Sequence, residues 1–193
     1  MVPLRILSVS GLLLLAGAVS AQVPTKCLEI ESILVDACIS STDCPGSAEG
    51  QNEMVRFRVG PQAIALSDLN VDWPNNSFNG LVQNSTSAAV TATLNASVTA
   101  CGLLLEPPGG LIPAGASVLL ITSTAMCTEA NSFAGLTDTL YVIFQQAGNT
   151  AGHFANQNNG SLVSPVPTGG PSLRTLVITR TSTNCSDTVT YDR

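Results

Sequence analysis

The residues best suited to chemistry are carboxylates in and before one charged stretch, "EGQNEMVRFRVG" (49–60), in a chain that is only 10% charged. Glu49 and Glu53 lie in this stretch, and Asp36 precedes it. Two carboxylates on either side of a bond can act as acid and as base or nucleophile, as in glycoside hydrolysis. The alternative is structural, because a buried Glu53 would have to accept hydrogen bonds from backbone or hydroxyl groups. We favour the structural interpretation.

A nucleophilic hydrolase would need a base, and the chain contains a single histidine, His153. His153 lies in "AGHFAN", within a segment (148–161) rich in Gly and Asn that predicts a long exposed loop. No G-x-S-x-G, H-E-x-x-H or phosphate-loop pattern is present in the sequence. We therefore interpret His153 as a surface residue, and we expect neither catalysis nor a cofactor.

Calcium is another candidate ligand, because Asp36, Asp43 and Glu49 could converge on the loop before the charged stretch. No D-x-D-x-D-G pattern supports such a site. Zinc would need closely spaced cysteine or histidine ligands, and the sequence has no C-x2-C pair. We expect no metal.

A glycan-binding site is the main alternative to a purely structural role, and it rests on "DWPNNSFNG" (72–80). Trp73 and Phe78 could stack on a sugar ring, while Asn75 and Asn76 could bond its hydroxyl groups. The structural alternative is that Trp73 closes a strand into the core and that the asparagines shape a turn.

The elements that position these residues are short β-branched runs separated by Gly, Pro and Asn, a pattern typical of an all-β sandwich or barrel. About eight strands are predicted, at 28–37, 53–59, 69–73, 101–106, 116–122, 138–144, 173–180 and 187–191. The segment 85–100 mixes helical spacing with Val and Thr, so we expect a short helix or an irregular excursion there.

Side chains alternate along the strand at 53–59, which divides the charged stretch. Glu53 points with Val55 and Phe57 toward the core, whereas Arg56 and Arg58 point to solvent. The two arginines need acids on a neighbouring strand. The available acids are Asp36, Asp68 and Asp72.

The first 21 residues have the pattern of a secretory signal peptide. One basic residue, Arg5, precedes an apolar run, and small residues at Val19-Ser20-Ala21 suit cleavage. The run is too short to span a bilayer, and no later segment reaches the roughly 18 apolar residues that spanning needs. We expect one exported domain over 22–193, without a membrane span.

The charge balance excludes nucleic acid as a partner. After Arg5 is removed with the leader, 13 acidic residues face six bases, which leaves a net charge near −7. Lys26 is the only lysine, so the cationic surface that dominates nucleic-acid binding is missing.

An even number of cysteines in an exported chain favours disulfides. The six cysteines are Cys27, Cys38, Cys44, Cys101, Cys127 and Cys185. A local bridge between Cys38 and Cys44 would pin the first loop. A bridge between Cys27 and Cys185 would tie the termini together, which leaves Cys101 with Cys127.

Four motifs follow one another along the chain. "IESILVDA" leads through a polar loop to "NEMVRFR", and "LSDLNVDW" and "LIPAGASVLLITS" follow. Together these motifs resemble the lamin-tail domain family. Arg56 departs from the family pattern, which usually has an acid there, and the region from about 74 to 100 resembles an insertion.

The resemblance implies an immunoglobulin-like β-sandwich that serves as an exported accessory module in bacterial surface proteins. It transfers no catalytic residue to this chain. We therefore expect a non-catalytic structural or adhesive module at the cell surface, forming part of a larger protein. Its expected partners are other domains, surface proteins or glycans. A small carboxylate-based hydrolase is the least favoured alternative.

Overall fold

A computed structural model describes residues 26–35, 37, 39, 42, 44–146, 152–154 and 173–192. The described part is all-β with one α-helix, α1 (Ser85–Ala96), and the predicted fold class is confirmed at that level. The strands are β1 (Leu28–Leu34), β2 (Met54–Val59), β3 (Ile64–Ala65), β4 (Leu69–Asp72), β5 (Leu81–Val82), β6 (Leu103–Leu105), β7 (Leu111–Ile112), β8 (Ser117–Ile121), β9 (Thr139–Gln145), β10 (Leu173–Arg180) and β11 (Cys185–Asp192). Single 3-10 turns are η1 (Glu49–Gln51), η2 (Leu66–Asp68) and η3 (Pro108–Gly110).

Each of the eight predicted strands overlaps an observed strand, and the uncertain segment at 85–100 begins with α1. Asn84 caps this helix, because its side-chain oxygen accepts hydrogen bonds from the backbone N–H groups of Thr86 and Ser87 at 2.9 and 3.1 Å. The strands β3, β5 and β7 were not predicted. Each has two residues, which is too short for side-chain alternation to be visible in the sequence.

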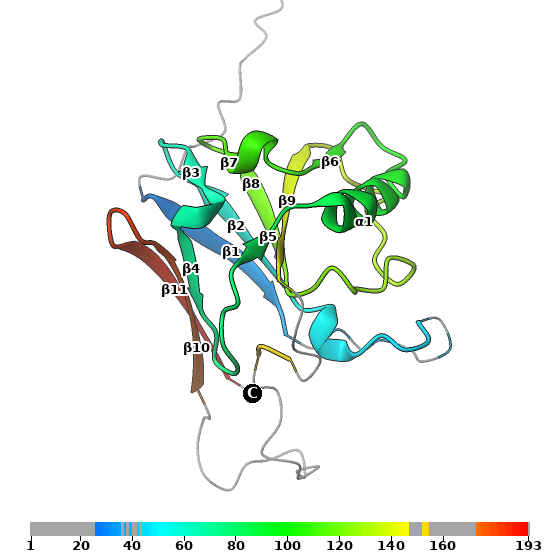
Figure 1. Ribbon diagram of the computed structural model, residues 1–193, viewed down its shortest axis with the longest axis horizontal. Helices are drawn as coiled ribbons and strands as arrows, with labels where there is room; N and C mark the ends of the chain where they lie inside the picture. Colours follow the sequence, from blue (N-terminus) through cyan, green and yellow to red (C-terminus); the bar gives the residue numbers. More distant parts are fainter. Residues whose placement is uncertain are drawn as a thin grey trace, which may run out of the picture.

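The strands form two main sheets that lie on opposite sides of one core (Figure 1). The larger sheet has the order β1-β2-β8-β9-β5, with β6 also paired to β9. Within it, β8 and β6 run parallel to β9, and the other pairs are antiparallel. The smaller sheet has the order β11-β10-β4 and is antiparallel, while β3 pairs with β7 separately.

The central strands are apolar on both sides because the larger sheet is covered on both faces. Its inner face contributes Val55, Phe57 and Val118 to the core shared with Leu176 and Ile178 of β10. The outer face is covered by α1 and the segment that follows β8 (Figure 1). A second apolar cluster of buried side chains lies there. That cluster is Met54, Leu94, Leu104, Leu119, Ile121, Met126, Leu140, Val142 and Phe144. A strand buried on two faces has a continuous apolar sequence, as in "SVLLI" of β8.

The charged stretch follows the predicted alternation along β2. Val55 and Phe57 are fully buried, and Arg56 is exposed. The two arginines do have an acidic partner on a neighbouring strand, but the acids predicted for this role were the wrong ones. Both arginines pair with Glu31 on β1, through Arg56 Nε to Oε2 at 2.9 Å and Arg58 Nε to Oε1 at 3.0 Å.

The acids predicted for that role lie elsewhere. Asp68 pairs with Arg180, Asp72 accepts a hydrogen bond from Asn70, and Asp36 lies outside the described residues. Glu31 can reach both arginines because β1 and β2 are adjacent antiparallel strands. Their register sets Ser32 opposite Arg56 and Glu29 opposite Arg58, so Glu31 lies between these two positions. The sequence could not show this pairing in advance.

Two disulfides close the described part of the chain, and one of them was predicted. Cys27 and Cys185 are bridged with a Cα–Cα distance of 6.3 Å, which confirms the expected link between the two ends.

The second disulfide joins Cys44 to Cys127, at a Cα–Cα distance of 5.8 Å. The predicted pairs Cys38–Cys44 and Cys101–Cys127 are therefore wrong. The reason is the antiparallel pairing of β2 with β8, which sets Met54 opposite Ile121 and so brings the loop before β2 beside the loop after β8. Cys101 is exposed and has no disulfide partner among the described residues, which do not include Cys38.

No helix in the described ranges is long and apolar enough to cross a membrane.

Candidate functional site

Glu53 lies at the start of β2 and points into the protein, as the structural interpretation predicted. It is 1% exposed. Its Oε2 accepts hydrogen bonds from the backbone N–H groups of His153 at 2.6 Å and of Phe154 at 3.4 Å. A carboxylate can be buried when such donors replace water. Glu53 is therefore bonded inside the fold and does not line an open cleft.

His153 is buried, so the expectation of a surface histidine was wrong. Its backbone carbonyl accepts a hydrogen bond from Asn75 N–H at 2.9 Å, and its side chain is 1% exposed. Ring atom Nδ1 lies 3.9 Å from Glu53 Oε2 and has no hydrogen-bond partner in the part of the chain that the structure describes. Burial lowers the pKa of His153 below its ordinary value of 6.5. The ring is neutral at neutral pH.

Trp73 and Gln145 determine which ring nitrogen of His153 carries the proton. Trp73 Nε1–H donates to Gln145 Oε1 at 2.6 Å, so the Gln145 amide presents its NH2 group to His153 Nε2. Because an indole nitrogen can only donate, this orientation of the amide is the one that satisfies both contacts. His153 Nε2 must then be the acceptor, and the proton of the neutral ring lies on Nδ1, toward Glu53.

Phe154 completes the packing of this segment. Its ring lies edge-on to Trp73 with centroids 5.4 Å apart and edge-on to Tyr191 at 5.7 Å. Edge-to-face pairs at such distances are favourable because of the ring quadrupoles. The segment Gly152–Phe154 is thus held by contacts from the ends of β2, β4, β9 and β11. We call the segment Gly152–Phe154, together with the residues Glu53, Trp73, Gln145 and Tyr191 that contact it, the GHF clasp.

Gly152 has a conformation that suits glycine in this clasp. Its φ is +87°, in the left-handed region, and a Cβ placed there would lie 3.0 Å from Glu53 Oε1. Its carbonyl accepts hydrogen bonds from the side-chain amides of Asn75, at 3.3 Å, and of Asn76.

The residues proposed for glycan binding do not form an exposed platform as they lie. Trp73 is 8% exposed, and its indole nitrogen is already bonded to Gln145. Phe78 is half-buried and packs against the inner core. The side chains of Asn75 and Asn76 bind Gly152. The structural alternative, in which Trp73 closes β4 into the core, describes this arrangement.

The residues considered for calcium are not brought together in the described part of the chain. Glu49 lies in η1, whereas Asp36 and Asp43 lie outside the described residues. Within the ranges that the structure describes, no group of three or more His, Cys, Asp or Glu side chains could hold a metal ion.

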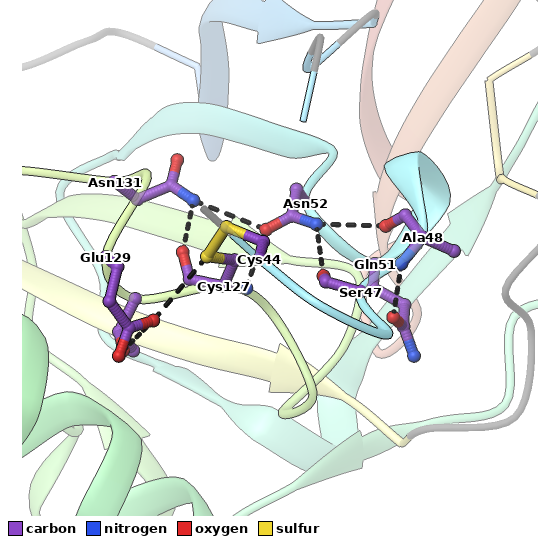
Figure 2. Close-up of a disulfide and its surroundings, with 9 residues drawn as sticks. Cys44, Ser47, Ala48, Gln51, Asn52, Cys127, Glu129 and Asn131 are labelled. Atoms are coloured by element: carbon purple, nitrogen blue, oxygen red, sulfur yellow. Dashed lines mark hydrogen bonds between the residues drawn. A yellow bond between two sulfur atoms is a disulfide. The ribbon is translucent and has the colours of Figure 1, made fainter. Parts of the chain in front are cut away.

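A cleft of about 410 Å³ lies beside the Cys44–Cys127 disulfide, between the loop 44–51 and the loop 125–129. Asn52 joins these loops, as Figure 2 shows. Its Oδ1 accepts a hydrogen bond from Cys127 N–H at 2.8 Å, and its Nδ2 donates to Ala48 O at 2.9 Å and to Ser47 Oγ at 3.0 Å. This cleft could not be predicted from the sequence, because it depends on the Cys44–Cys127 pairing, which was not predicted.

The cleft does not include the candidate catalytic groups. Glu129 is the ionisable residue that lines it, and neither Glu53 nor His153 does. The arrangement therefore separates the buried acid and histidine from the open surface next to the disulfide.

Comparison with models of protein families, with curated proteins and with solved structures gives no significant match. The resemblance to the lamin-tail domain therefore stays a prediction from the sequence motifs.

Proposed function

We propose that this chain is an exported, non-catalytic module of the lamin-tail type, with an immunoglobulin-like sandwich, that acts structurally or adhesively at the cell surface. It works beside other domains or surface proteins. The leader pattern at 1–21 supports export, and the two long-range disulfides suit an oxidising compartment. The shared core between two sheets is compatible with a sandwich.

The observation that carries the proposal is the burial of the acid and base candidates. The side chains of Glu53 and His153 are each 1% exposed, and Glu53 is bonded to the backbone of the segment that covers it. A general acid or base must come within hydrogen-bond reach of its substrate. These two groups instead hold the segment Gly152–Phe154 against the start of β2, which is a structural role.

The buried positions of Trp73 and Glu53 support glycan binding and carboxylate hydrolysis less well than they support a structural role. A glycan-binding role for Trp73 would require the ring to leave its contacts with Gln145, His153 and Phe154. A carboxylate hydrolase based on Glu53 would require the clasp to open for every substrate.

The enzyme alternative is tested with the full chain and its Glu53→Gln variant on a broad panel of glycosides and esters. We expect no turnover by either protein above a blank. The matched control is Glu129→Gln, which removes a carboxylate at the cleft. Turnover that Glu53→Gln abolishes and Glu129→Gln retains would overturn the proposal.

Export and surface function are tested by expressing the full chain in an export-competent host. We expect a mature N-terminus at Gln22 by Edman sequencing, and retention of the mature protein on the surface of the cells that secrete it. Recovery of the uncleaved chain inside the cells would contradict export. Free diffusion of the mature protein into the medium, without retention, would contradict a surface role.

A further inference from the structure

The GHF clasp contains the chain's only histidine and its only tryptophan in direct contact, and both are buried. It connects four strands through a three-residue segment, and the hydrogen bond between Gln145 and the His153 ring depends on the protonation state of that ring. We infer that the clasp is an acid-sensitive latch, which holds Gly152–Phe154 against the end of the two sheets while His153 is neutral and releases it when His153 is protonated. This goes beyond the proposed surface role, which would hold without a latch.

The hydrogen-bond pattern explains why protonation opposes the clasp. With the neutral proton on Nδ1, a second proton must go to Nε2, which accepts from Gln145. Two donors would then face each other. If Gln145 turned its amide to offer oxygen to the imidazolium, the same oxygen would leave Trp73 Nε1–H without its partner. Each of these outcomes loses a buried hydrogen bond.

The charges around His153 do not compensate for this loss. Among the residues that the structure describes, Glu53, from the start of β2, is the ionisable group that faces the ring, with Oε2 3.9 Å from Nδ1. That oxygen already accepts the His153 backbone N–H at 2.6 Å. The other neighbours that contact His153 within the described ranges are neutral, namely Trp73 after β4, Gln145 of β9 and the backbone of Asn75. Tyr191 of β11 touches Phe154, and a phenol stays neutral at acidic pH.

Burial also opposes protonation of His153 in the clasp, since it lowers the pKa of the ring. The folded protein therefore binds this proton less readily than the released segment does. The free energy that holds the clasp is complete above the ordinary pKa of 6.5 and declines as the pH falls below it. The two disulfides do not involve this segment, so the remaining fold has its own covalent support.

The first experiment needs no variant, because the single histidine gives one Hε1 signal and the single tryptophan gives one indole N–H signal. The full chain is titrated from pH 8 to pH 4.5. We expect His153 Hε1 to titrate with a midpoint below 6.5 and the Trp73 indole N–H signal to shift at the same midpoint. Far-UV circular dichroism should stay constant. A midpoint at 6.5 with no change at Trp73, or a titration that coincides with loss of circular dichroism, would overturn the latch.

Hydrogen exchange then distinguishes release from simple protonation. Below the midpoint, we expect the amides of His153 and Phe154 to lose protection at least tenfold after correction for intrinsic rates, while the amides of β2 and β8 keep theirs. Unchanged protection of these two amides would show that the ring is protonated in place, which would contradict the inference.

Two variants complete the test. His153→Gln keeps an acceptor for Gln145 but cannot titrate, so its Trp73 fluorescence should be independent of pH from 7.5 to 5. Glu53→Gln removes the facing carboxylate, and the His153 midpoint should move further down. Glu129→Gln, which removes a carboxylate at the disulfide cleft, should leave the midpoint unchanged. A pH response that persists in His153→Gln would assign the switch to another group and overturn the latch.

Discussion

Ser182 donates two hydrogen bonds to the carboxylate of Asp68, from its backbone N–H at 2.6 Å and from its hydroxyl at 2.5 Å. The same carboxylate accepts Thr181 Oγ1 at 2.8 Å and Arg180 Nε at 3.0 Å. Asp68 ends η2 just before β4, and Ser182 lies in the turn between β10 and β11. The acid therefore binds that turn to the first residues of the edge strand β4, where Leu69 pairs with Arg180.

We expect Asp68→Asn to destabilise the smaller sheet. Asparagine has one acceptor oxygen and no charge, so it can satisfy only part of this donor set. The melting temperature should fall by about 2–4 °C in calorimetry. Asp72→Asn is the matched control, because Asp72 is an exposed acid on the same edge strand that accepts a bond from Asn70, and it should change the melting temperature by less than about 1 °C. Equal effects of the two substitutions would contradict the special role of Asp68.

The contribution of Asp68 should also depend on pH. Hydrogen bonds from the Ser182 hydroxyl and backbone N–H hold the pKa of Asp68 far below its ordinary value of 3.8. A carboxyl whose pKa is lower in the folded state stabilises the protein above the unfolded value, and this stabilisation is lost as the pH falls through the folded value. The difference in melting temperature between the wild type and Asp68→Asn should therefore narrow between pH 5 and pH 2. A constant difference over this range would contradict the assignment.

Asn52 is expected to be among the most sensitive polar residues of the chain. Asn52→Ala would leave Cys127 N–H without its acceptor in a buried position, and a stranded buried donor costs about 1–3 kcal/mol. Urea denaturation should show at least this loss in the free energy of unfolding. The exposed Asn79→Ala serves as the control and should stay within about 0.5 kcal/mol of the wild type. A neutral Asn52→Ala would show that water or a neighbour replaces the lost acceptor.

Both disulfides should contribute to stability, and their connectivity can be checked directly. Peptide mapping without reduction should recover Cys27 with Cys185 and Cys44 with Cys127. Each double Cys→Ser variant should lose about 2–5 kcal/mol of unfolding free energy, because the open chain gains entropy in the unfolded state. Recovery of a Cys38–Cys44 peptide would overturn the connectivity described here.

The positions of the strands could be predicted from the sequence because alternation and apolar runs are local signals. The run "SVLLI" and the alternation in "MVRFRV" each report which faces of a strand are covered. Partner choice is not a local signal. Glu31 pairs with Arg56 and Arg58 only because β1 lies beside β2, and Cys44 meets Cys127 only because β2 lies beside β8.

Of the candidate site, only the part that depends on local alternation could be predicted from the sequence. The inward direction of Glu53 follows from its place beside Val55 and Phe57. The burial of His153 depends on the donors and rings of four strands that are distant in sequence, whereas its neighbours in the chain have the composition of a loop. The adjacent Phe154 was a usable signal, since a large apolar residue in a polar segment often has a buried partner.

The ion pairs of Glu31 are partly exposed to water, unlike the buried hydrogen bonds of Asn52. Glu31 bridges two arginines, but the side chains are between 27% and 46% exposed, so water and salt screen the pairs. Glu31→Gln should lower the unfolding free energy by less than about 1 kcal/mol, and the effect should shrink further in 1 M NaCl. Urea denaturation at low and high salt measures both quantities. If the loss instead matched that of Asn52→Ala and persisted in high salt, the bridge would be supporting the register of β1 on β2 rather than only its surface charge.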